Sequence, residues 1–556
     1  MVMDNLLSYQ VNNLLSDKRT VGSCVNTIEE LSVEVYSKIR LGYANKKAAS
    51  GLMDFDDMQS YLYLWLVKFG SSEDENERNT AAGIRSYCRA MWRDFYIDEA
   101  QDVSKIQFEI LKSMMTEPDA PNKLLVNLVV IGDDDQCIYE WRGSNPSILL
   151  SIGPTFNIRT LVLSTNYRCK RNILDYASNG IKYNTTRYEK GMKSYMDGGE
   201  VEIIKSKKMD LYSLSGIARD CVKKFMSGGS KESEIAVLSR NNFHLCILSN
   251  MLLRDGIYCY MTDDMKLTKS YMYRDIKSLF DLSEPSWKST LTSSMLWRTC
   301  HYMSKAASSL IGNFQDSTGL SLCDTLGYLL KKFTNRGINF DTTGKKIVIP
   351  KQTEQQLDYY MSRLQSVTID DLEDIYNALN TGDSKKAFEI LTFKYLETSS
   401  YMYKSKDKKR TIQGIIKYIT YLIEEDGVEK TKSLLRVTEQ FENSRMGIVG
   451  DRVTLSTIHS AKGREWKNVI MFACDNISQP SFDGICSMVD KGVSVSDIFK
   501  NIDEERRLFY VGNTRAKDKL TVITYEEPSI FMKEALGEVD NSNNDDRILR
   551  LAQGVE

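Results

Sequence analysis

The apolar run Phe95–Ile97 ends in two adjacent carboxylates, Asp98 and Glu99, and this pairing suits phosphoryl chemistry. Asp98 could hold Mg²⁺, because hard cations prefer carboxylate oxygens. Glu99 could orient or deprotonate a water that attacks a phosphoryl group. The alternative interpretation is an acidic helix N-terminus stabilised by the helix dipole.

A second apolar run, Leu124–Ile131, ends in Gly132, three aspartates and Gln136, and a polar loop with Trp141 and Arg142 follows. Gln136 could sense a γ-phosphate by hydrogen bonding. A base could stack on Trp141, and Arg142 could hold a backbone phosphate. The alternative is a core tryptophan beside a calcium-binding acidic loop. The aspartate run lacks the Gly and terminal Glu spacing of an EF-hand, which argues against calcium.

Three later blocks carry basic groups at expected strand ends or helix starts. Arg168 follows the run Leu161–Leu163 and could reach an anion across a cleft. The stretch 456–466 is a small, basic, Gly-containing turn suited to phosphate or ribose contacts. In the stretch 504–516 the helical spacing makes Arg515 project from a packed apolar stripe. Taken singly, each block could be a solvated arginine, a loop histidine or an ion-paired helix.

The elements that must position these residues follow from apolar periodicity. Short runs rich in β-branched residues alternate with longer stretches of helical spacing, such as Lys105–Met115 and Glu504–Val511. This alternation predicts parallel α/β sheets, whose active groups gather at the carboxyl ends of the strands. The expected strands are Phe95–Ile97, Leu124–Ile131, Leu161–Leu163, Ile235–Leu238, Val453–Leu455, Val469–Ala473 and Leu520–Ile523.

Other parts of the chain differ in composition. Residues 283–443 are rich in Lys, Ser, Tyr and Leu with helical periodicity, which predicts a helical insertion, and residues 1–50 also look helical. Two acidic, polar stretches, Glu73–Asn79 and Asp540–Asp546, are expected to be a surface loop and a loose tail. The basic stretch Lys404–Arg410 could touch duplex DNA or a partner, or be a solvated charged face.

Composition narrows the class of protein. The 556 residues are 42% hydrophobic and 27% charged, which excludes a mainly disordered chain. Lys plus Arg (73) nearly balances Asp plus Glu (75), so a nucleic-acid surface would be a local basic groove. Eleven cysteines without a CxxC pair indicate reduced thiols, and three distant histidines argue against a His-rich zinc site. Neither an 18-residue apolar run nor a signal pattern occurs, so we expect a cytoplasmic protein of a bacterial or phage-infected cell.

In their order and placement, the five blocks resemble motifs II to VI of the UvrD/Rep/PcrA family of superfamily 1 DNA helicases. Met53–Met58 looks like the family's segment before motif II, and Pro528–Phe531 looks like its closing element. The resemblance covers almost the whole chain and is weakest across the helical insertion. It implies two RecA-like parallel-sheet motor domains with helical insertions, ATP bound between them, and 3′-to-5′ translocation on single-stranded DNA.

The resemblance also implies a domain division and a set of partners. Single-stranded DNA and junctions of single- and double-stranded DNA would be the substrates, with ATP and Mg²⁺ as cofactors. Repair, replication, recombination and phage DNA metabolism all fit the sequence. The expected domains are a remnant of the first helical insertion (1–50), the C-terminal part of the first motor domain (51–158), the second motor domain in two segments (159–282 and 444–535) around its helical insertion (283–443), and a flexible tail (536–556).

Individual roles carry over by similarity. Arg168 and Arg515 would act as arginine fingers, Tyr167 would stack near the adenine, and Glu465 would contact the nucleotide sugar or metal region. Arginine fingers can contribute about 10³–10⁵ in phosphoryl transfer. The implied catalytic residues are Asp98 (also the metal ligand), Glu99, Gln136, Arg168 and Arg515; the implied cofactor-binding residues are Tyr167, Gly463 and Glu465; and the implied DNA-binding residues are Trp141, Arg142, Thr457 and His459.

One departure from the family stands out. No G-x-x-x-x-G-K-[ST] phosphate-binding loop occurs, and the nearest fragments, Gly228–Lys231 and Thr343–Lys346, have neither its spacing nor its context. Asp98 also comes too early for the loop to precede it, so the first motor domain is expected to be truncated at its N-terminus.

A second polypeptide could supply the loop, the sequence could be one piece of a longer gene product, or the chain could be a non-hydrolysing relative that binds DNA or partners. Retention of the five implied catalytic groups favours the first two explanations. A truncated sheet would expose an edge and apolar surface, which predicts poor solubility alone and rescue by a partner.

Overall fold

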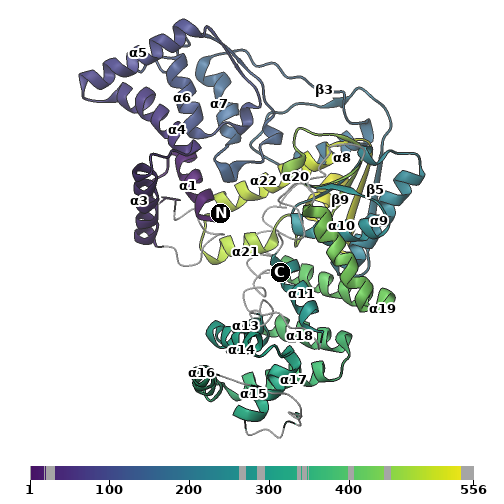
Figure 1. The fold of residues 1–556 in the computed structure, drawn as a ribbon. Helices are drawn as coiled ribbons and strands as arrows, with labels where there is room; N and C mark the ends of the chain where they lie inside the picture. The colour runs from purple at the N-terminus through teal and green to yellow at the C-terminus, as the bar shows by residue number, and fades with distance from the viewer. Residues whose placement is uncertain are drawn as a thin grey trace. The chain divides into compact units, whose positions relative to one another are not determined.

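The structure is a computed structural model that describes residues 2–17, 19–20, 32–261, 271–284, 295–334, 338, 340, 347, 350–398, 406–443 and 452–539. Within them, parallel strands alternate with helices (Figure 1). The α/β class with parallel sheets that the sequence predicts is therefore confirmed. The phosphate-loop fragment Thr343–Lys346 lies outside the described residues, as do residues 540–556 of the expected tail and the start of the basic stretch Lys404–Arg410.

The first two strands form a small parallel pair. β1 (Asp94–Ile97) lies beside β2 (Asn127–Val130), with Asp94 opposite Asn127 and Ile97 opposite Val130. Both strands therefore end at the same edge, which brings the residues after Ile97 and after Val130 together. A second short parallel pair joins β3 (Thr165–Asn166) to β4 (Lys193–Ser194).

The remaining strands form a six-stranded sheet with the order β5-β10-β9-β6-β8-β7. In Figure 1, β5 lies beside strands from the C-terminal part of the chain, which are drawn in yellow-green. β6 and β7 both run parallel to β8, and every residue of β6 is buried. The bounds are β5 Glu200–Ser206, β6 Ile235–Ser239, β7 Cys259–Met261, β8 Val453–Thr457, β9 Trp466–Phe472 and β10 Ala516–Tyr525.

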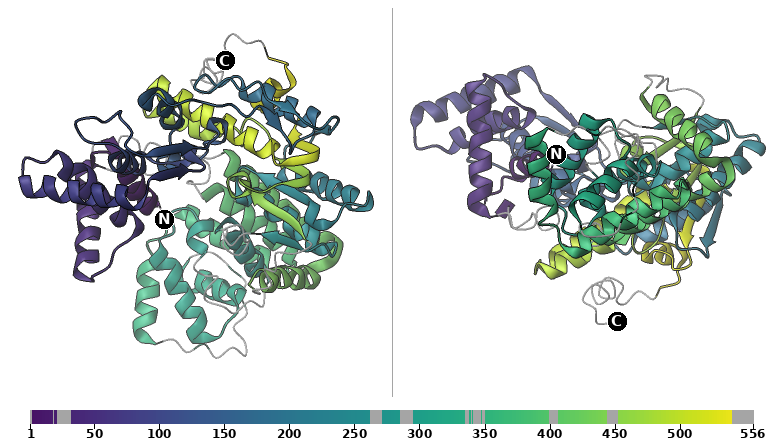
Figure 2. Two further views of the ribbon diagram at one scale, coloured as in Figure 1. Left: turned by 90° about the horizontal axis from the view of Figure 1, so that it is seen from above. Right: turned by 60° about the horizontal axis from the view of Figure 1, so that its bottom comes forward.

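The chain divides into two compact units, and residues 1–203, 458–522 and 527–556 make up the first. Near its N-terminus Leu66, Ile106 and Ile110 form an apolar cluster, and Figure 2 shows the purple helices of the first 60 residues gathered together from two further directions. A second cluster joins Ala177 and Ile181 to Tyr510. The helices of this unit are α1 Val2–Asn13, α3 Val33–Ala49, α4 Phe55–Tyr63, α5 Glu75–Met91, α6 Lys105–Met115, α7 Pro146–Phe156, α8 Arg171–Ile181, α20 Ile458–Ala461, α21 Phe482–Asp490, α22 Val495–Asn513 and α23 Ile530–Leu536.

Residues 204–457 and 523–526 make up the second unit. The described residues of the interval 283–443 contain helices and no strand, as the sequence predicts. The longest helix, α19, is interrupted at Gly427, which has a φ of 78°. The helices of this unit are α9 Leu211–Ser227, α10 Cys246–Arg254, α11 Tyr271–Leu282, α13 Leu296–Thr299, α14 Lys305–Thr318, α15 Leu322–Phe333, α16 Lys351–Met361, α17 Ser366–Asn380, α18 Ser384–Thr398 and α19 Lys406–Asn443.

Three local predictions were wrong. Arg515 does not project from a helix, because α22 ends at Asn513 and the Arg515 side chain in the following turn is buried. Leu161–Leu163 is not a strand: pairing begins only at Thr165, and the Leu163 side chain is 87% exposed. Apolar character alone does not make a strand when no neighbouring backbone pairs with the segment. Glu73–Asn79 is not a loop throughout, because α5 begins at Glu75. The Asp74 carboxylate caps that helix by accepting a hydrogen bond from the Asn76 N–H, and acidic residues in a first turn favour the helix.

Candidate active site

The loop after β1 holds both candidate carboxylates at the carboxyl end of the strand. The Asp98 side chain is exposed and its carboxylate accepts a hydrogen bond from the Glu99 N–H at 2.9 Å. Glu99 has a φ of 49°, in the left-handed region that a non-glycine residue rarely adopts. Backbone strain of this kind clusters at functional sites, so it marks Glu99 as a candidate for function beyond its acidity.

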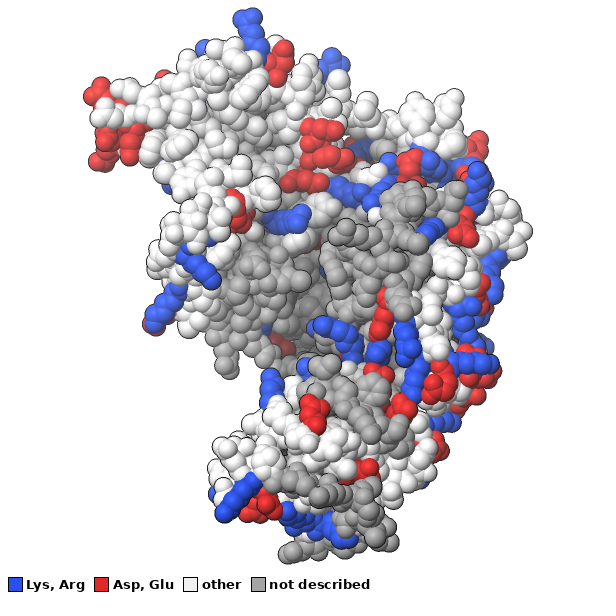
Figure 3. Space-filling model, in the orientation of Figure 1, with Lys and Arg blue, Asp and Glu red and all other residues white. Residues whose placement is uncertain are grey.

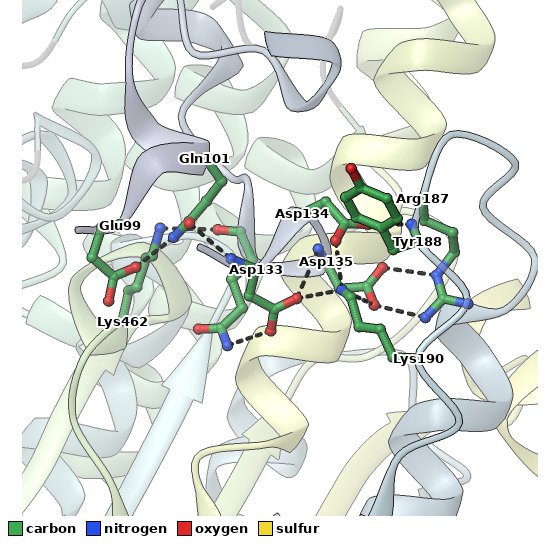
Figure 4. A network of polar contacts seen from close by, with 10 residues as sticks. Glu99, Gln101, Asp133, Asp134, Asp135, Arg187, Tyr188, Lys190 and Lys462 are labelled. Carbon is green, nitrogen blue, oxygen red and sulfur yellow. Dashed lines mark hydrogen bonds and ion pairs between the residues drawn. The ribbon is translucent and has the colours of Figure 1, made fainter. Parts of the chain in front are cut away.

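Gln101 links the two strand-end loops. Its side chain is fully buried; its amide nitrogen donates to the Glu99 carboxylate, and its amide oxygen accepts from the Asp133 N–H at 2.9 Å. The Asp133 carboxylate in turn accepts from Gln136 Nε2 at 2.7 Å. Figure 4 shows this chain of contacts running from Glu99 to Asp133. The structure thus brings Glu99 and Gln136 into one hydrogen-bonded network.

The aspartates that follow β2 are neutralised by a loop between α8 and β4. Arg187 binds the Asp135 carboxylate through two nitrogens, at 2.9 and 2.7 Å. Lys190 contacts the carboxylates of all three aspartates, and Figure 4 shows it reaching Asp133 and Asp135. Burial alone would raise the pKa of Asp133, but the Lys190 ammonium holds it below its usual value. The run of aspartates is therefore an ion-paired structural element.

Lys462, in the block 456–466, contacts both strand-end loops. Its ammonium lies 2.7 and 2.6 Å from the two carboxylate oxygens of Asp102, and it donates to the Gln136 carbonyl at 2.9 Å. The Lys462 side chain is 9% exposed. This lysine therefore ties a late segment of the chain to the loops that carry Glu99 and Gln136.

Arg168 forms an ion-pair bridge with Glu465 and Lys517. Arg168 Nε lies 2.6 Å from one Glu465 oxygen, and Lys517 Nζ lies 2.6 Å from the other. These two cations, Lys517 first, lower the pKa of Glu465 to about 2. The carboxylate predicted to contact a nucleotide sugar or metal thus neutralises one of the two predicted arginine fingers.

Arg515 is almost completely buried, and its guanidinium meets only neutral acceptors among the contacts of the described residues. It donates to the carbonyls of Val511 and Arg464, at 2.9 and 3.3 Å, and to the Thr514 hydroxyl at 3.2 Å. Burial, followed by the positive charge of Arg168, lowers the pKa of Arg515 to about 10. A buried cation next to another cation is well suited to receive an anion.

Aromatic rings gather around the predicted DNA contacts. The guanidinium carbon of Arg142 lies 4.8 Å from the centroid of the Trp141 ring. The centroid of the Tyr139 ring lies 6.5 Å from that of Trp141 and 6.2 Å from that of His459. The Tyr139 hydroxyl donates to the His459 carbonyl at 3.2 Å, and Lys462 lies over the Tyr139 ring. Because Trp141 is 43% exposed, its ring remains accessible to a base.

A second tie joins this loop to the block 504–516. Arg507, on α22, donates to the Cys137 carbonyl at 3.0 Å and pairs with the Glu140 carboxylate. Glu504 accepts from the Glu140 N–H at 3.0 Å. The Glu140 charge keeps the pKa of Arg507 above its usual value although burial acts in the opposite direction. The loop that presents Trp141 is therefore held by helix α22.

The other predicted site residues lie as follows. Tyr167 directly follows β3 and is 69% exposed, whereas Thr457 is the last residue of β8, in the second unit. Gly463 lies in the turn between α20 and β9 with a φ of 80°, a conformation that favours glycine.

Sequence reasoning singled out the blocks but missed several residues that connect them. Three of these connecting residues lie inside the blocks or next to them, namely Gln101, Lys462 and Arg507. Their polar character beside apolar strand ends is the sequence signal that could have identified them. Arg187 and Lys190 lie outside the blocks, and nothing in their local spacing points to the aspartates about 50 residues earlier.

In the part of the chain that the structure describes, no three or more His, Cys, Asp and Glu side chains form a group that could hold a metal ion, and no helix is long and apolar enough to cross a membrane. Mg²⁺ typically uses one or two carboxylates together with substrate phosphates, so a single exposed Asp98 fits such an ion. Figure 3 shows Lys and Arg interspersed with Asp and Glu among the described residues of the face it presents.

Comparison with known proteins identifies the family. Residues 161–527 match the UvrD-like helicase C-terminal domain, and residues 3–157 match the UvrD/REP helicase N-terminal domain. The ATP-dependent DNA helicase PcrA of Staphylococcus epidermidis is 23% identical over 534 residues, which cover 94% of this chain and 65% of that protein. The ATP-dependent DNA helicase Rep of Buchnera aphidicola is 23% identical over 542 residues, covering 93% of this chain and 73% of that protein.

Staphylococcus aureus PcrA is 22% identical over 522 residues, covering 92% of this chain and 64% of that protein. The chain therefore spans slightly less than two thirds of the length of these PcrA relatives. The two domain matches follow one another along the chain and include each block described above. This chain belongs to the UvrD/Rep/PcrA family of UvrD-like helicases.

Proposed function

We propose that this chain is the motor of an ATP-dependent DNA helicase that moves 3′ to 5′ on single-stranded DNA, with junctions of single- and double-stranded DNA as its substrates. The observation that carries the proposal is the set of contacts made by Lys462. This side chain binds Asp102 and the Gln136 carbonyl on the candidate ATP side, and it lies 5.0 Å from the Tyr139 ring on the candidate DNA side. A group shared by both sides can couple hydrolysis to movement.

At the nucleotide, different residues of this chain would bind the metal ion, activate water and stabilise charge. Asp98 would hold Mg²⁺, whose chemistry when bound is to neutralise phosphate oxygens. Glu99, kept in place by Gln101, would orient the attacking water and take its proton. Arg168 and Arg515 would stabilise the charge that develops on the transferred phosphoryl group. For Arg168 to do so, it must exchange Glu465 for phosphate oxygens.

Gln136 would report the γ-phosphate to the DNA side, because its carbonyl already accepts from Lys462. Tyr167 would stack near the adenine, and Gly463 and Glu465 would lie near the sugar. On the DNA side Trp141 would stack on a base and Arg142 would hold a phosphate, with His459 and Thr457 nearby. Stepwise opening and closing against a stacked base would give translocation.

The sequence contains no G-x-x-x-x-G-K-[ST] loop, and we propose that a second polypeptide supplies it. The exposed apolar surface of the first unit supports this proposal. Parallel sheets occur almost only with both faces covered, yet Tyr96 on β1 is 73% exposed and Val129 on β2 is 44% exposed. Most of the large apolar side chains that are exposed among the described residues lie between residues 33 and 167. A strand added parallel to β1 and β2 would end beside Asp98 and Glu99, where the loop is needed.

For the domain division we keep the boundaries expected from the sequence. Residues 51–158 would form the described part of the first motor domain, preceded by an insertion remnant in residues 1–50. Residues 159–282 and 444–535 would form the second motor domain around the helical insertion 283–443, with 536–556 as a tail. The all-helical secondary structure of the described part of 283–443 supports the insertion.

The experiment is ATP hydrolysis by the purified chain, with and without single-stranded DNA, alone and together with a polypeptide that bears a phosphate-binding loop. We expect DNA-stimulated turnover only in the mixture, and its loss in Glu99→Gln. Turnover by the chain alone would contradict the second polypeptide. Salt-sensitive DNA binding without turnover in any mixture would contradict the helicase and favour a non-hydrolysing DNA-binding relative.

The direction of movement needs a separate measurement. A fluorophore at the 5′ end of an oligonucleotide should report arrival of a 3′-to-5′ translocase, with a delay that grows with oligonucleotide length. A length-dependent signal from the 3′ end instead would reverse the proposed direction.

A further inference from the structure

Two exposed tyrosine rings stand side by side after the β3–β4 pair. The Tyr167 and Tyr195 ring centroids lie 5.1 Å apart with the planes tilted by 38°. The side chains are 69% and 72% exposed, among the highest fractions for aromatic residues in the described chain. Isolated exposed aromatic residues are common on proteins, but two in mutual contact form a continuous π surface that water solvates poorly.

The backbone holds the two rings in register. β3 and β4 are parallel with Asn166 opposite Ser194, so the next residues, Tyr167 and Tyr195, follow at the same level. The Tyr195 N–H donates to the Asn166 carbonyl at 2.8 Å, which extends the pairing to the tyrosine itself.

Each tyrosine also lies in a turn that a neighbouring side chain closes. The Asn166 side-chain oxygen accepts from the N–H groups of Arg168 and Cys169, at 2.9 and 2.8 Å, and thereby closes the turn around Tyr167. The Ser194 hydroxyl oxygen accepts from the Met196 N–H at 3.1 Å and closes the turn around Tyr195. Both rings are therefore presented by constrained backbone, which lowers the entropic cost of binding a ligand on them.

Charged groups next to this pair suit the rest of a nucleotide. Arg168 directly follows Tyr167 in the chain, and its guanidinium shares the Glu465 carboxylate with Lys517. Lys517 belongs to a segment that is tied to the tyrosine segment, because the Lys170 N–H donates to its carbonyl at 3.1 Å. The surface thus combines a π face for a base with two cations for phosphates and a carboxylate for ribose hydroxyls.

We infer that Tyr195 joins Tyr167 in a two-ring platform that binds the base of a nucleoside triphosphate. At 5.1 Å the two rings already touch, so the base stacks on the outer face of the pair and does not enter between them. Tyr195 is a specificity-determining residue on this platform: it enlarges the stacking surface and holds the Tyr167 ring. The inference rests on the proposed function for the identity of the ligand.

The test is a binding titration of this 556-residue chain, which requires no hydrolysis. ATP and inorganic tripolyphosphate are compared, each with Mg²⁺, because only ATP carries a base. We expect Tyr195→Ala to weaken ATP binding about tenfold while tripolyphosphate binding is unchanged. Tyr195→Phe should keep the wild-type affinity for ATP. Tyr302→Ala removes a tyrosine that is 76% exposed in the second unit and should change neither.

Several outcomes would overturn the inference. Equal affinity of the wild-type chain for ATP and tripolyphosphate, or no binding of either, would mean that no base site exists. Equal losses for both ligands in Tyr195→Ala would reveal a merely structural residue. If Tyr195→Ala weakened binding of oligothymidylate but not of ATP, the platform would serve DNA bases. Because hydrolysis is not measured, an inactive ATPase would leave this test intact, and a failed base site would not by itself contradict the helicase.

Discussion

The ammonium of Lys462 lies 2.7 and 2.6 Å from the two carboxylate oxygens of Asp102. These residues are 360 positions apart, and the contact joins the block 456–466 to the loop that follows β1. Burial raises the pKa of Asp102 even though Lys462 acts in the opposite direction. Loss of the lysine would therefore leave a partly buried carboxylate without its cation, which is costly in a protein interior.

We accordingly predict that Lys462→Met destabilises the first unit by about 1–3 kcal/mol, while Lys462→Arg loses less. Urea unfolding at neutral pH measures the effect. Asp102→Asn in the Lys462→Met background should recover part of the loss, because the uncompensated charge is gone. Additive single and double substitutions would show that the pair does not interact energetically.

Substitution of Arg515 should abolish ATP hydrolysis without lowering the stability of the fold. Its guanidinium is buried, its pKa is lowered to about 10, and its hydrogen bonds go to neutral oxygens. A depressed pKa means that the folded chain disfavours the charged form, so Arg515→Met should keep or increase stability, by up to roughly 3 kcal/mol. In the completed enzyme the same substitution should abolish ATP hydrolysis and leave DNA binding nearly unchanged. Unchanged turnover would refute the finger assignment.

Much of the local structure followed from the sequence. The apolar run Phe95–Ile97 lies within β1, and the expected helix Lys105–Met115 has the bounds of α6. Both depend on short-range signals, namely apolar runs and the Ser104 cap of α6. The grouping of Glu99 with Gln136 followed as well, because parallel strands end at one edge.

Contacts that depend on distant loops did not follow from the sequence. Lys190 neutralises three aspartates more than 50 positions away. The hydrophobic periodicity of the sequence does not indicate which loops contact one another. The prediction of a strand at Leu161–Leu163 was wrong for a related reason, since a strand needs a partner backbone as well as apolar side chains. The position of Glu465 between Arg168 and Lys517 likewise depends on tertiary structure, so its predicted role near a sugar or metal remains a prediction.

The Glu465 bridge predicts an acid-dependent contribution to stability. The pKa of this carboxyl is lowered from 4.5 to about 2, first by Lys517 and then by Arg168. A depressed carboxyl pKa stabilises the fold fully above the unfolded value, and this contribution is lost as the pH falls towards the folded value. The gap in urea midpoint between wild type and Glu465→Gln should thus be constant from pH 7 to pH 5 and narrow by pH 3.

A matched control for that measurement is Glu34→Gln. Glu34 pairs with Lys38 on α3, and both side chains are more than 70% exposed, so solvent screens the pair. We expect no gap at any of the three pH values. A gap for Glu465→Gln that widened in acid would reverse the sign of the argument and contradict the bridge.

On the DNA side, Trp141 and Arg142 should contribute in different ways. Trp141→Ala removes a stacking surface and should weaken single-stranded DNA binding by about 1–3 kcal/mol with little change in salt dependence. Arg142→Ala should reduce the slope of log affinity against log salt by roughly one phosphate contact. Fluorescence anisotropy over a salt series separates the two. Trp92→Ala, at another exposed tryptophan of the first unit, should change neither quantity.

A buried ion pair between Arg506 and Glu534 lies in the core of the first unit. Both side chains are fully buried, and Arg506 binds Glu534 through two nitrogens at 2.8 and 3.0 Å. Arg506 also donates to the side chain of Asn184 at 2.7 Å, so one cation joins α22, α23 and the loop after α8. Arg506→Met removes this cation from the buried Glu534 carboxylate and should destabilise the unit by about 3–5 kcal/mol.

A surface pair provides the comparison for this substitution. Arg219 pairs with Asp220 on α9 with both side chains at least one third exposed, so Arg219→Met should cost well under about 1 kcal/mol. Arg506→Met combined with Glu534→Leu replaces this pair by apolar groups and should recover part of the stability, because the buried Glu534 charge is gone while Asp503, 3.0 Å from Arg506, still loses that contact. If the double variant were as unstable as the single one, Arg506 would act through Asn184 and the local packing instead of through Glu534.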